Sequence, residues 1–131
     1  MAWEAPGQIV SFPCATTGLV RYRFVNISTA GRVIRTVLGG PSIGVIQDGT
    51  TGSTVDPTVA SVMISGVSKI AVAASSTVGV GQIISASSHG SPVPSTVGTF
   101  VAGQIIAGSS AGANRVLSVL IAGVGNSTAL V

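Results

Sequence analysis

The feature of this chain that most constrains its fold is the frequent interruption of short apolar runs by glycine and proline. No run keeps apolar residues at helical spacing over the length of a helix, whereas residues 59–65 and 67–73 have the two-residue period of a strand. Short strands at intervals of roughly 8 to 20 residues, separated by glycine turns, are typical of all-β domains. We therefore expect an all-β fold.

The expected elements divide the chain into an N-terminal arm (residues 1–20), a β domain (residues 21–122) and a loose C-terminal tail (residues 123–131). Proline, glycine and small polar residues mark the loops, and the runs between them are the expected strands. The expected strands of the β domain are residues 19–25, 32–38, 42–47, 59–65, 67–73, 81–85, 99–107 and 115–121. The expected loops are residues 48–57, 75–79, 89–98 and 108–113.

The N-terminal arm is extended and irregular, yet it is apolar. Pro6 and Pro13 interrupt any regular element, because proline lacks a backbone donor. The apolar side chains of the arm, which are costly to leave in water, include Trp3, Ile9 and Phe12. Two interpretations stay open. Either the arm docks on a neighbouring protein, or residues 8–12 form an edge strand over the chain's own core.

Charge is scarce. Six basic and three acidic side chains make up 7% of the chain, against about 25% in a typical soluble protein. A folded monomer of this size exposes roughly 6,300 Å², which leaves about one charge per 700 Å². Such a surface predicts that other protein covers much of it, in an obligate oligomer or an assembly. The alternative is a monomer kept soluble by its serine and threonine hydroxyls.

Few side chains could support catalysis or bind a metal. The whole supply of carboxylates and imidazole is Glu4, Asp48, Asp56 and His89, and Cys14 has no partner cysteine. A Gly-x-Ser-x-Gly pattern surrounds Ser110, but no acid or histidine follows it to complete a hydrolase triad. One histidine without neighbouring ligands makes no zinc site. We expect no enzyme activity, no cofactor and no metal.

The mean hydropathy of +0.70 would suit a membrane protein. However, a spanning helix needs about 18 to 20 consecutive apolar residues, and the best stretches are short or interrupted. The first residues also lack the basic and long apolar segments of a signal peptide. We expect a protein made in the cytoplasm, with no membrane partner.

One basic cluster stands out in this weakly charged chain. It consists of Arg21, Arg23, Arg32 and Arg35, with no acid among them. Guanidinium groups suit planar hydrogen bonding to carboxylate or phosphate. If residues 19–25 form a strand, Arg21 and Arg23 lie on one face and the two aromatic side chains on the other. That separation disfavours a single-stranded nucleic-acid site, in which bases stack beside the bound phosphates.

A weak internal repeat has a spacing of 22. Residues 81–84 and 103–106 both read Gly-Gln-Ile-Ile, and serines and a glycine recur after them. Two copies are too few for a solenoid. We interpret them as two similar strand-and-turn units of one β domain.

From Arg21 onward, the order of elements resembles the small head decoration proteins of tailed bacteriophages. The residues that carry the resemblance are Arg21-Tyr22-Arg23, Ile43-Gly44-Val45-Ile46, Ser65-Gly66-Val67 within residues 62–72, Gly81-Gln82-Ile83-Ile84, a turn at Gly90 with Pro94 after it, and residues 97–103 before a final strand at 116–121. These are glycine and valine patterns over about three quarters of the chain. Gln82 stands where the family usually has an acid.

The resemblance implies a compact β-barrel or tulip-like domain, commonly trimeric, that acts as capsid cement. Such a protein would bind the outer surface of a phage head and clamp neighbouring major capsid proteins, without enzymatic activity. Trp3, Pro6, Ile9 and Phe12 would then form a capsid-binding arm, and the arginines a basic contact patch. Two other functions stay open: a nucleic-acid-binding β module that uses residues 21–35, and a structural component of a tail or fibre.

Overall fold

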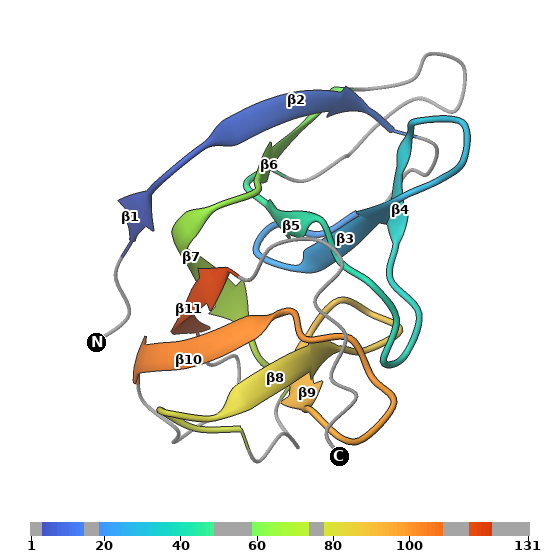
Figure 1. The fold of residues 1–131 in the computed structure, drawn as a ribbon. Coiled ribbons are helices and arrows are strands. Elements are labelled where there is room, and N and C mark those ends of the chain that lie inside the picture. Colours follow the sequence, from blue (N-terminus) through green and yellow to red (C-terminus); the bar gives the residue numbers. More distant parts are fainter. Residues whose placement is uncertain (1–3, 15–18, 49–58, 74–77, 109–115, 122–131) are drawn as a thin grey trace.

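A computed structural model describes the chain at residues 4–14, 19–48, 59–73, 78–108 and 116–121. Within these residues every regular element is a strand, and none is a helix long and apolar enough to cross a lipid bilayer. The predicted all-β fold is confirmed (Figure 1). The strands are β1 (Ala5–Pro6), β2 (Ile9–Pro13), β3 (Phe24–Ile27), β4 (Val33–Arg35), β5 (Gly44–Ile46), β6 (Val59–Met63), β7 (Gly66–Ala71), β8 (Ile83–Ala86), β9 (Pro92–Pro94), β10 (Gly103–Gly108) and β11 (Val116–Ile121).

The strands form two antiparallel sheets. The N-terminal sheet has the order β2-β6-β5-β3-β4, and the C-terminal sheet has the order β1-β7-β11-β10-β8-β9. In Figure 1 the N-terminal sheet occupies the upper part of the molecule and the C-terminal sheet the lower part. The chain passes from one sheet to the other between β6 and β7, where Gly66 has a φ of 100° that favours glycine.

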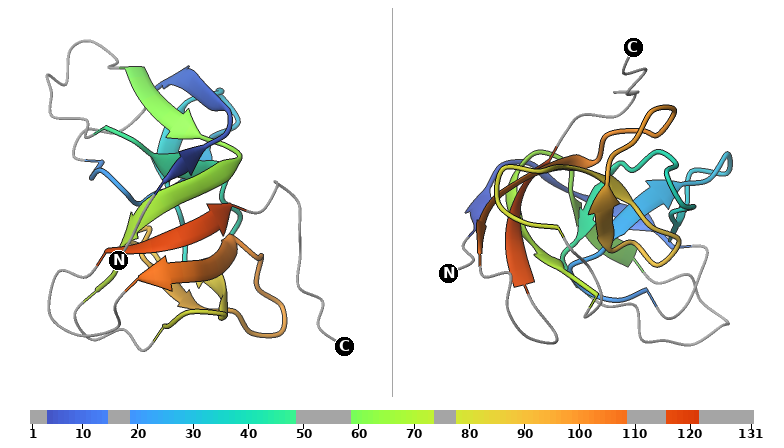
Figure 2. Two further views of the ribbon diagram at one scale, coloured as in Figure 1. Left: turned by 90° about the vertical axis from the view of Figure 1, so that its left-hand side faces the viewer. Right: turned by 90° about the horizontal axis from the view of Figure 1, so that it is seen from below.

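Neither sheet closes into the predicted β-barrel. The N-terminal sheet is strongly curled (Figure 2), but among the described residues its two edges meet only at an isolated parallel bridge between Cys14 and Val33. The C-terminal sheet ends on β9, where Pro92 and Pro94 lack the N–H groups that a further strand would need. The barrel prediction is therefore wrong in its closure, although both sheets curve around an apolar core.

The two sheets are two copies of one structural unit. The strand order β2-β6-β5-β3-β4 corresponds in sequence order to β7-β11-β10-β8-β9. Adding 59 to the residue numbers of the β3–β4 and β3–β5 pairs reproduces the register of the β8–β9 and β8–β10 pairs. For example, Val25 pairs with Arg35 and with Gly44, and Ile84 pairs with Pro94 and with Gly103. We call residues 8–63 the first half and residues 66–121 the second half.

Backbone hydrogen bonds repeat with the same spacing. Tyr22 N donates to Ile46 O at 2.9 Å, and Gly81 N donates to Ile105 O at 2.7 Å. The turn after β3 and the turn after β8 also match: Gly31 N donates to Ser28 O and Gly90 N to Ser87 O, and both glycines have a φ of 78°. The fold is therefore a tandem duplication.

The predicted repeat at spacing 22 has a different explanation. The two Gly-Gln-Ile-Ile segments lie in or beside β8 and β10, which are neighbours in the C-terminal sheet. Gln104 is paired with Ile83, and Gly103 with Ile84. The two segments therefore run antiparallel to each other within one half, and they are not the structural unit that is duplicated.

The N-terminal sheet lies between two cores. Alternate residues of β3, β5 and β6 enter different clusters: Val25, Ile46 and Val62 enter the core of the first half, and Phe24, Val45 and Met63 enter the core of the second half. Their strands are thus buried on both faces, which explains why β5 is apolar throughout. The described part of the chain exposes 6450 Å².

Local departures from the expected strands have identifiable causes. The strand expected at 19–25 begins only at Phe24, because Tyr22 has a left-handed φ of 63° and residues 21–22 form a turn. Part of the loop expected at 89–98 is β9, a strand that tolerates prolines because it lies at the sheet edge. Most of the loops expected at 48–57, 75–79 and 108–113, and the expected tail, lie outside the described residues.

The described part of the N-terminal arm belongs to the sheets. β1 pairs with β7, and β2 pairs with β6 from Ile9 opposite Met63 to Pro13 opposite Val59. Of the two interpretations, the edge strand over the chain's own core is therefore the one in the structure. Pro13 fits there because an edge strand needs no donor on its open side.

Candidate functional site

The arginines of the basic cluster lie around the start of β3 and the β3–β4 hairpin. Arg21 and Tyr22 form the turn before β3, and the Arg21 guanidinium carbon lies 4.4 Å from the centre of the Tyr22 ring. This is cation–π geometry. The expected separation of an arginine face from an aromatic face is therefore wrong, because the left-handed Tyr22 breaks the two-residue alternation.

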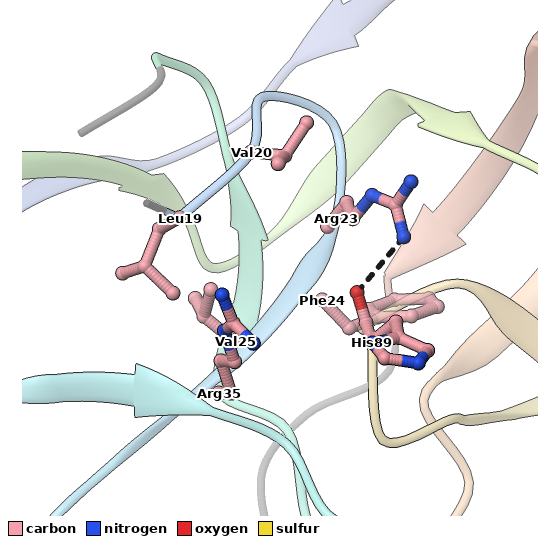
Figure 3. Close-up of a pocket in the computed structure, with 7 residues that line it drawn as sticks. All are labelled: Leu19, Val20, Arg23, Phe24, Val25, Arg35 and His89. Atoms are coloured by element: carbon pink, nitrogen blue, oxygen red, sulfur yellow. Dashed lines mark hydrogen bonds between the residues drawn. The ribbon is translucent and has the colours of Figure 1, made fainter. Parts of the chain in front are cut away.

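Arg23 and Arg35 line one pocket, with a volume of about 370 Å³ (Figure 3). The pocket opens beside β3 where the second half meets the first. Its other lining residues are Leu19, Val20, Phe24, Val25 and His89. The walls are thus mixed: four side chains are apolar, and the polar groups come from two arginines and one turn histidine.

Arg23 is held in place by the second half. Its Nη1 donates to the carbonyl oxygen of His89 at 3.1 Å, the dashed line in Figure 3. Its Nε is buried and has no hydrogen-bond partner among the described residues. None of the seven lining residues is acidic. A carboxylate brought to this pocket would be attracted by the two arginines that line it.

The remaining arginines of the basic contact patch do not line this pocket. Arg32 is exposed in the turn between β3 and β4, where its carbonyl oxygen accepts from Ser28 N at 2.8 Å. Arg21 is exposed on the Tyr22 ring. The four arginines of the predicted patch therefore do not form one site: Arg23 and Arg35 line the pocket, and Arg21 and Arg32 lie elsewhere on the surface.

The predicted capsid-binding arm is only partly described. Trp3 lies outside the described residues, and of Pro6 the structure gives only the backbone pairing with Gly66. Phe12 is half-buried and packs on the core of the first half, so it stabilises the chain's own fold. Ile9 is 48% exposed, so its apolar side chain lies at the surface.

Two exposed apolar surfaces were not predicted from the sequence. One comprises Val37, Leu38 and Val97, on adjacent loops that are joined by a hydrogen bond from Phe100 N to Gly39 O. The other comprises Ile83 and Leu120, which flank Gln104 in neighbouring strands. The counterparts of this second surface in the first half, Phe24, Val45 and Met63, are buried, so comparing the two halves by sequence gives no sign of its exposure.

The structure brings the other candidate catalytic or metal-ligating residues into no common site among the described residues. His89 is exposed in the turn after β8, and Cys14 is buried in the core of the first half. The described residues contain no cluster of three or more metal-ligating side chains. Ser110 and Asp56 lie outside the described residues.

No known family model matches the chain, and no protein of curated function matches its sequence. Its fold matches the crystal structure of the head fiber gp8.5 N base in bacteriophage phi29 with a TM-score of 0.67. The match covers 88% of this chain and 95% of that chain, at 18% sequence identity. The chain therefore shares the fold of that protein over nearly its whole described length.

Proposed function

We propose that the protein is a structural component of a phage head, located in the virion on the outer capsid surface. There it acts as a homotrimeric decoration protein that clamps neighbouring major capsid proteins, and it has no enzymatic role. The observation that carries the proposal is the fold shared with a phage head fiber base across almost the whole of both chains. The low charge of the chain, 7% of residues, supports a surface covered by other protein.

The contacts to the capsid would come from two chemically different places. The pocket of Arg23 and Arg35 suits a carboxylate of the major capsid protein, because its apolar walls strengthen charge-assisted hydrogen bonds. The arm, through Ile9 and the more N-terminal Trp3, would add apolar contact area. Several weak sites on each of three chains would act together through avidity.

A second function, the base of a head fibre, is favoured by the description of the matched structure itself. Both functions require binding to a capsid, and they differ in what binding does. A clamp raises the stability of the shell, because it binds the assembled state and not separated subunits. A fibre base that rests on a single capsid subunit binds assembled and separated subunits alike, and therefore lacks that effect.

The test is co-sedimentation with empty expanded heads assembled from the major capsid protein encoded alongside this chain. We expect saturable binding, and shells that unfold at higher temperature when it is bound. Binding without added shell stability would favour the fibre base. Failure to bind heads would refute both functions.

Single charge-removing variants locate the contact. Arg35→Gln should weaken head binding by about tenfold or more, since a charge-assisted hydrogen bond is lost. The control variant is Lys69→Gln on β7, which removes the same charge at a position that does not line the pocket. Deletion of residues 1–4 tests the part of the arm that contains Trp3 while leaving β1 and β2 in place. Tight binding of single-stranded DNA that falls steeply with salt would instead favour the nucleic-acid-binding alternative.

A further inference from the structure

The N-terminal sheet has an open edge along β2. β2 is the outermost strand of the order β2-β6-β5-β3-β4, and no described strand pairs with its other side. It runs along the upper margin of the molecule in Figure 1. The isolated bridge of Cys14 to Val33 lies beyond the last residue of β2, so it leaves this side of the strand open. We call the side of β2 that faces away from β6 the β2 edge.

The hydrogen bonds of β6 show which backbone groups of β2 point to this edge. Ser61 lies opposite Ser11 in the ladder. Its carbonyl oxygen accepts from Gln47 N at 2.8 Å, and its N–H donates to Asp48 Oδ1 at 3.0 Å. Both groups of Ser61 are thus used away from β2, so the pair of Ser11 with Ser61 is the kind without hydrogen bonds. The N–H and C=O groups of Ser11, and of Ile9 two positions before it, therefore point outward at the β2 edge.

The other three edges of the described sheets carry features that discourage pairing with another chain. Such features are short length, proline and charge. β1 has only two residues and ends on proline, β4 has three residues and ends on Arg35, and β9 has three residues of which two are proline. β2 has five residues and no charge, and its one proline is the last residue. Among the described strands, β2 therefore has the least protected edge.

The duplication shows that a strand can be added at this position of the architecture. β7 is the counterpart of β2, and Val67 on β7 corresponds to Ile9. In the second half the edge is covered, because β1 pairs there with Ala5 opposite Val67. In the first half no described strand takes the equivalent place. The β2 edge is thus a position for strand addition.

We propose that the strand added at the β2 edge is β2 of a second copy of this chain, in an antiparallel pair about a twofold axis. The axis passes between the two copies of Val10, so that Ile9 of each chain lies opposite Ser11 of the other. In this register the outward groups of Ile9 and Ser11 all find partners, because each residue exchanges both backbone hydrogen bonds with the residue opposite. Pro13, which lacks an N–H, is not needed.

The sequence of β2 favours a second copy as the occupant. A strand that pairs with its own copy brings the same side chains close together, and like charges in such a pair are destabilising. β2 has no charged side chain, so self-pairing meets no such repulsion. Pairing also covers part of the apolar side chain of Ile9, which is 48% exposed.

This contact goes beyond the proposed function, because it is twofold, whereas a trimer has a threefold contact, and because it involves no capsid protein. It would join one decoration protein to the next. A pair of single strands buries less than the roughly 800 Å² per partner of a stable complex. The association is therefore weak and depends on concentration, and it doubles whatever mass the chain has in dilute solution.

The first test is the native mass of the full chain by sedimentation, from dilute to concentrated solution. We expect the mass to double as the concentration rises. Ser11→Pro removes one outward N–H and leaves the bonds between β2 and β6 in place, since an edge strand tolerates a proline whose nitrogen faces solvent. It should weaken the doubling by about tenfold or more, because one hydrogen bond is lost on each side of the axis. The control Ser11→Ala keeps the N–H and should associate like the unmodified chain.

The second test is a crosslink that reports the register. Val10 is half-buried, and in the proposed pair the two copies of Val10→Cys lie directly opposite each other, within reach of a disulfide. Under mild oxidation a crosslinked dimer should form about tenfold faster than with Thr29→Cys in the exposed turn after β3, because a held pair has a higher effective concentration. Cys14 is buried and present in both variants, so it adds the same background. Adding Ser11→Pro to the Val10→Cys chain should slow crosslinking to the control rate.

Three results would overturn the proposal: a mass that does not change with concentration, a Ser11→Pro chain that still doubles, or Val10→Cys crosslinking no faster than the control. If thermal melts show that Ser11→Pro is unfolded, the crosslinking rate of Val10→Cys decides. A constant mass together with weaker head binding by Ser11→Pro would assign the β2 edge to a strand of the capsid protein instead. If the mass doubles but the chain ignores phage heads, this inference stands and the proposed function fails.

Discussion

The variants Gly31→Ala and Gly90→Ala make the same substitution at two equivalent turn positions that differ in their packing. Both glycines have a φ of 78°, so the left-handed backbone costs alanine about 1–2 kcal/mol at either site. A Cβ at Gly31 meets nothing within 4 Å, whereas a Cβ at Gly90 would lie 2.4 Å from Phe24 O. The difference between the two variants therefore isolates the packing of one half on the other.

The magnitude follows from what must move. An ordinary carbon–oxygen contact is longer than this by about 1 Å, so the turn at Gly90 must retreat from β3. Retreat weakens the 2.7 Å bond from Phe24 N to Gly90 O, which contributes about 0.5–1.5 kcal/mol. It also loosens Phe24, a side chain type whose complete removal from a core costs about 3–5 kcal/mol. We expect Gly90→Ala to cost about 2–4 kcal/mol more than Gly31→Ala.

The assay is urea unfolding followed by far-UV circular dichroism. Both variants are measured at the same protein concentration, so that any self-association contributes equally to the two. With a slope of about 1–3 kcal/mol per molar urea, the two midpoints should differ by about 1–2 M. Equal midpoints would refute the reasoning, because the halves could not then be packed through the turn at Gly90.

Further predictions concern buried hydroxyls. Thr36→Val removes the donor to Ser87 O and should cost about 1–2 kcal/mol in thermal melts, while Thr29→Val in the exposed turn should change stability by less than about 0.5 kcal/mol. Ser85→Ala removes a buried hydroxyl that donates to Phe100 O at 2.6 Å, so urea unfolding should show a loss of about 1–3 kcal/mol. An unchanged midpoint would mean that this hydroxyl does not hold the β9–β10 connection.

Local chemistry was enough to predict the strands that are long and regular. Residues 59–65 and 67–73 have a two-residue period; the first range contains β6 and the second contains β7 except for its first residue, Gly66. Glycine and proline marked most of the boundaries, since they act on the backbone directly. β9 was missed because prolines normally argue against a strand, and only its place at the sheet edge makes them acceptable.

The duplication could not be predicted from the Gly-Gln-Ile-Ile repeat at spacing 22, which is the plainest repeat in the sequence. Between residues 24–46 and their counterparts at 83–105, the identical residues are Ser28 and Ser87, Gly31 and Gly90, Gly39 and Gly98, Gly44 and Gly103, and Ile46 and Ile105. Most of these are turn or close-contact positions, where the backbone dictates the residue. The remaining positions need only apolar or small side chains, so their identities have diverged.

The arm and the basic cluster depended on information that is not local. Ile9 and Phe12 contact either a neighbouring protein or the chain's own core. The pairing of β2 with β6 decides between the two, and the residues of β6 lie about fifty positions after those of β2 in the sequence. The alternation of Arg21 and Arg23 with Tyr22 and Phe24 predicts a strand, and nothing in it signals the positive φ of Tyr22, which tyrosine seldom adopts. Its counterpart Gly81 carries the signal for that turn, and it becomes readable only once the halves are aligned.

The comparison of halves also separates what the fold needs from what it does not. The counterparts of Arg21, Arg23, Arg32 and Arg35 in the second half are Val80, Gln82, Ser91 and Pro94, none of which is charged. The second half forms the same strands and turns without any of the four positive charges. Folding therefore does not require arginine at these positions. Arg23 nevertheless contributes a bond between the halves, from its Nη1 to the carbonyl oxygen of His89. The counterpart positions in the second half are uncharged, so a single duplicated unit presents two chemically different surfaces.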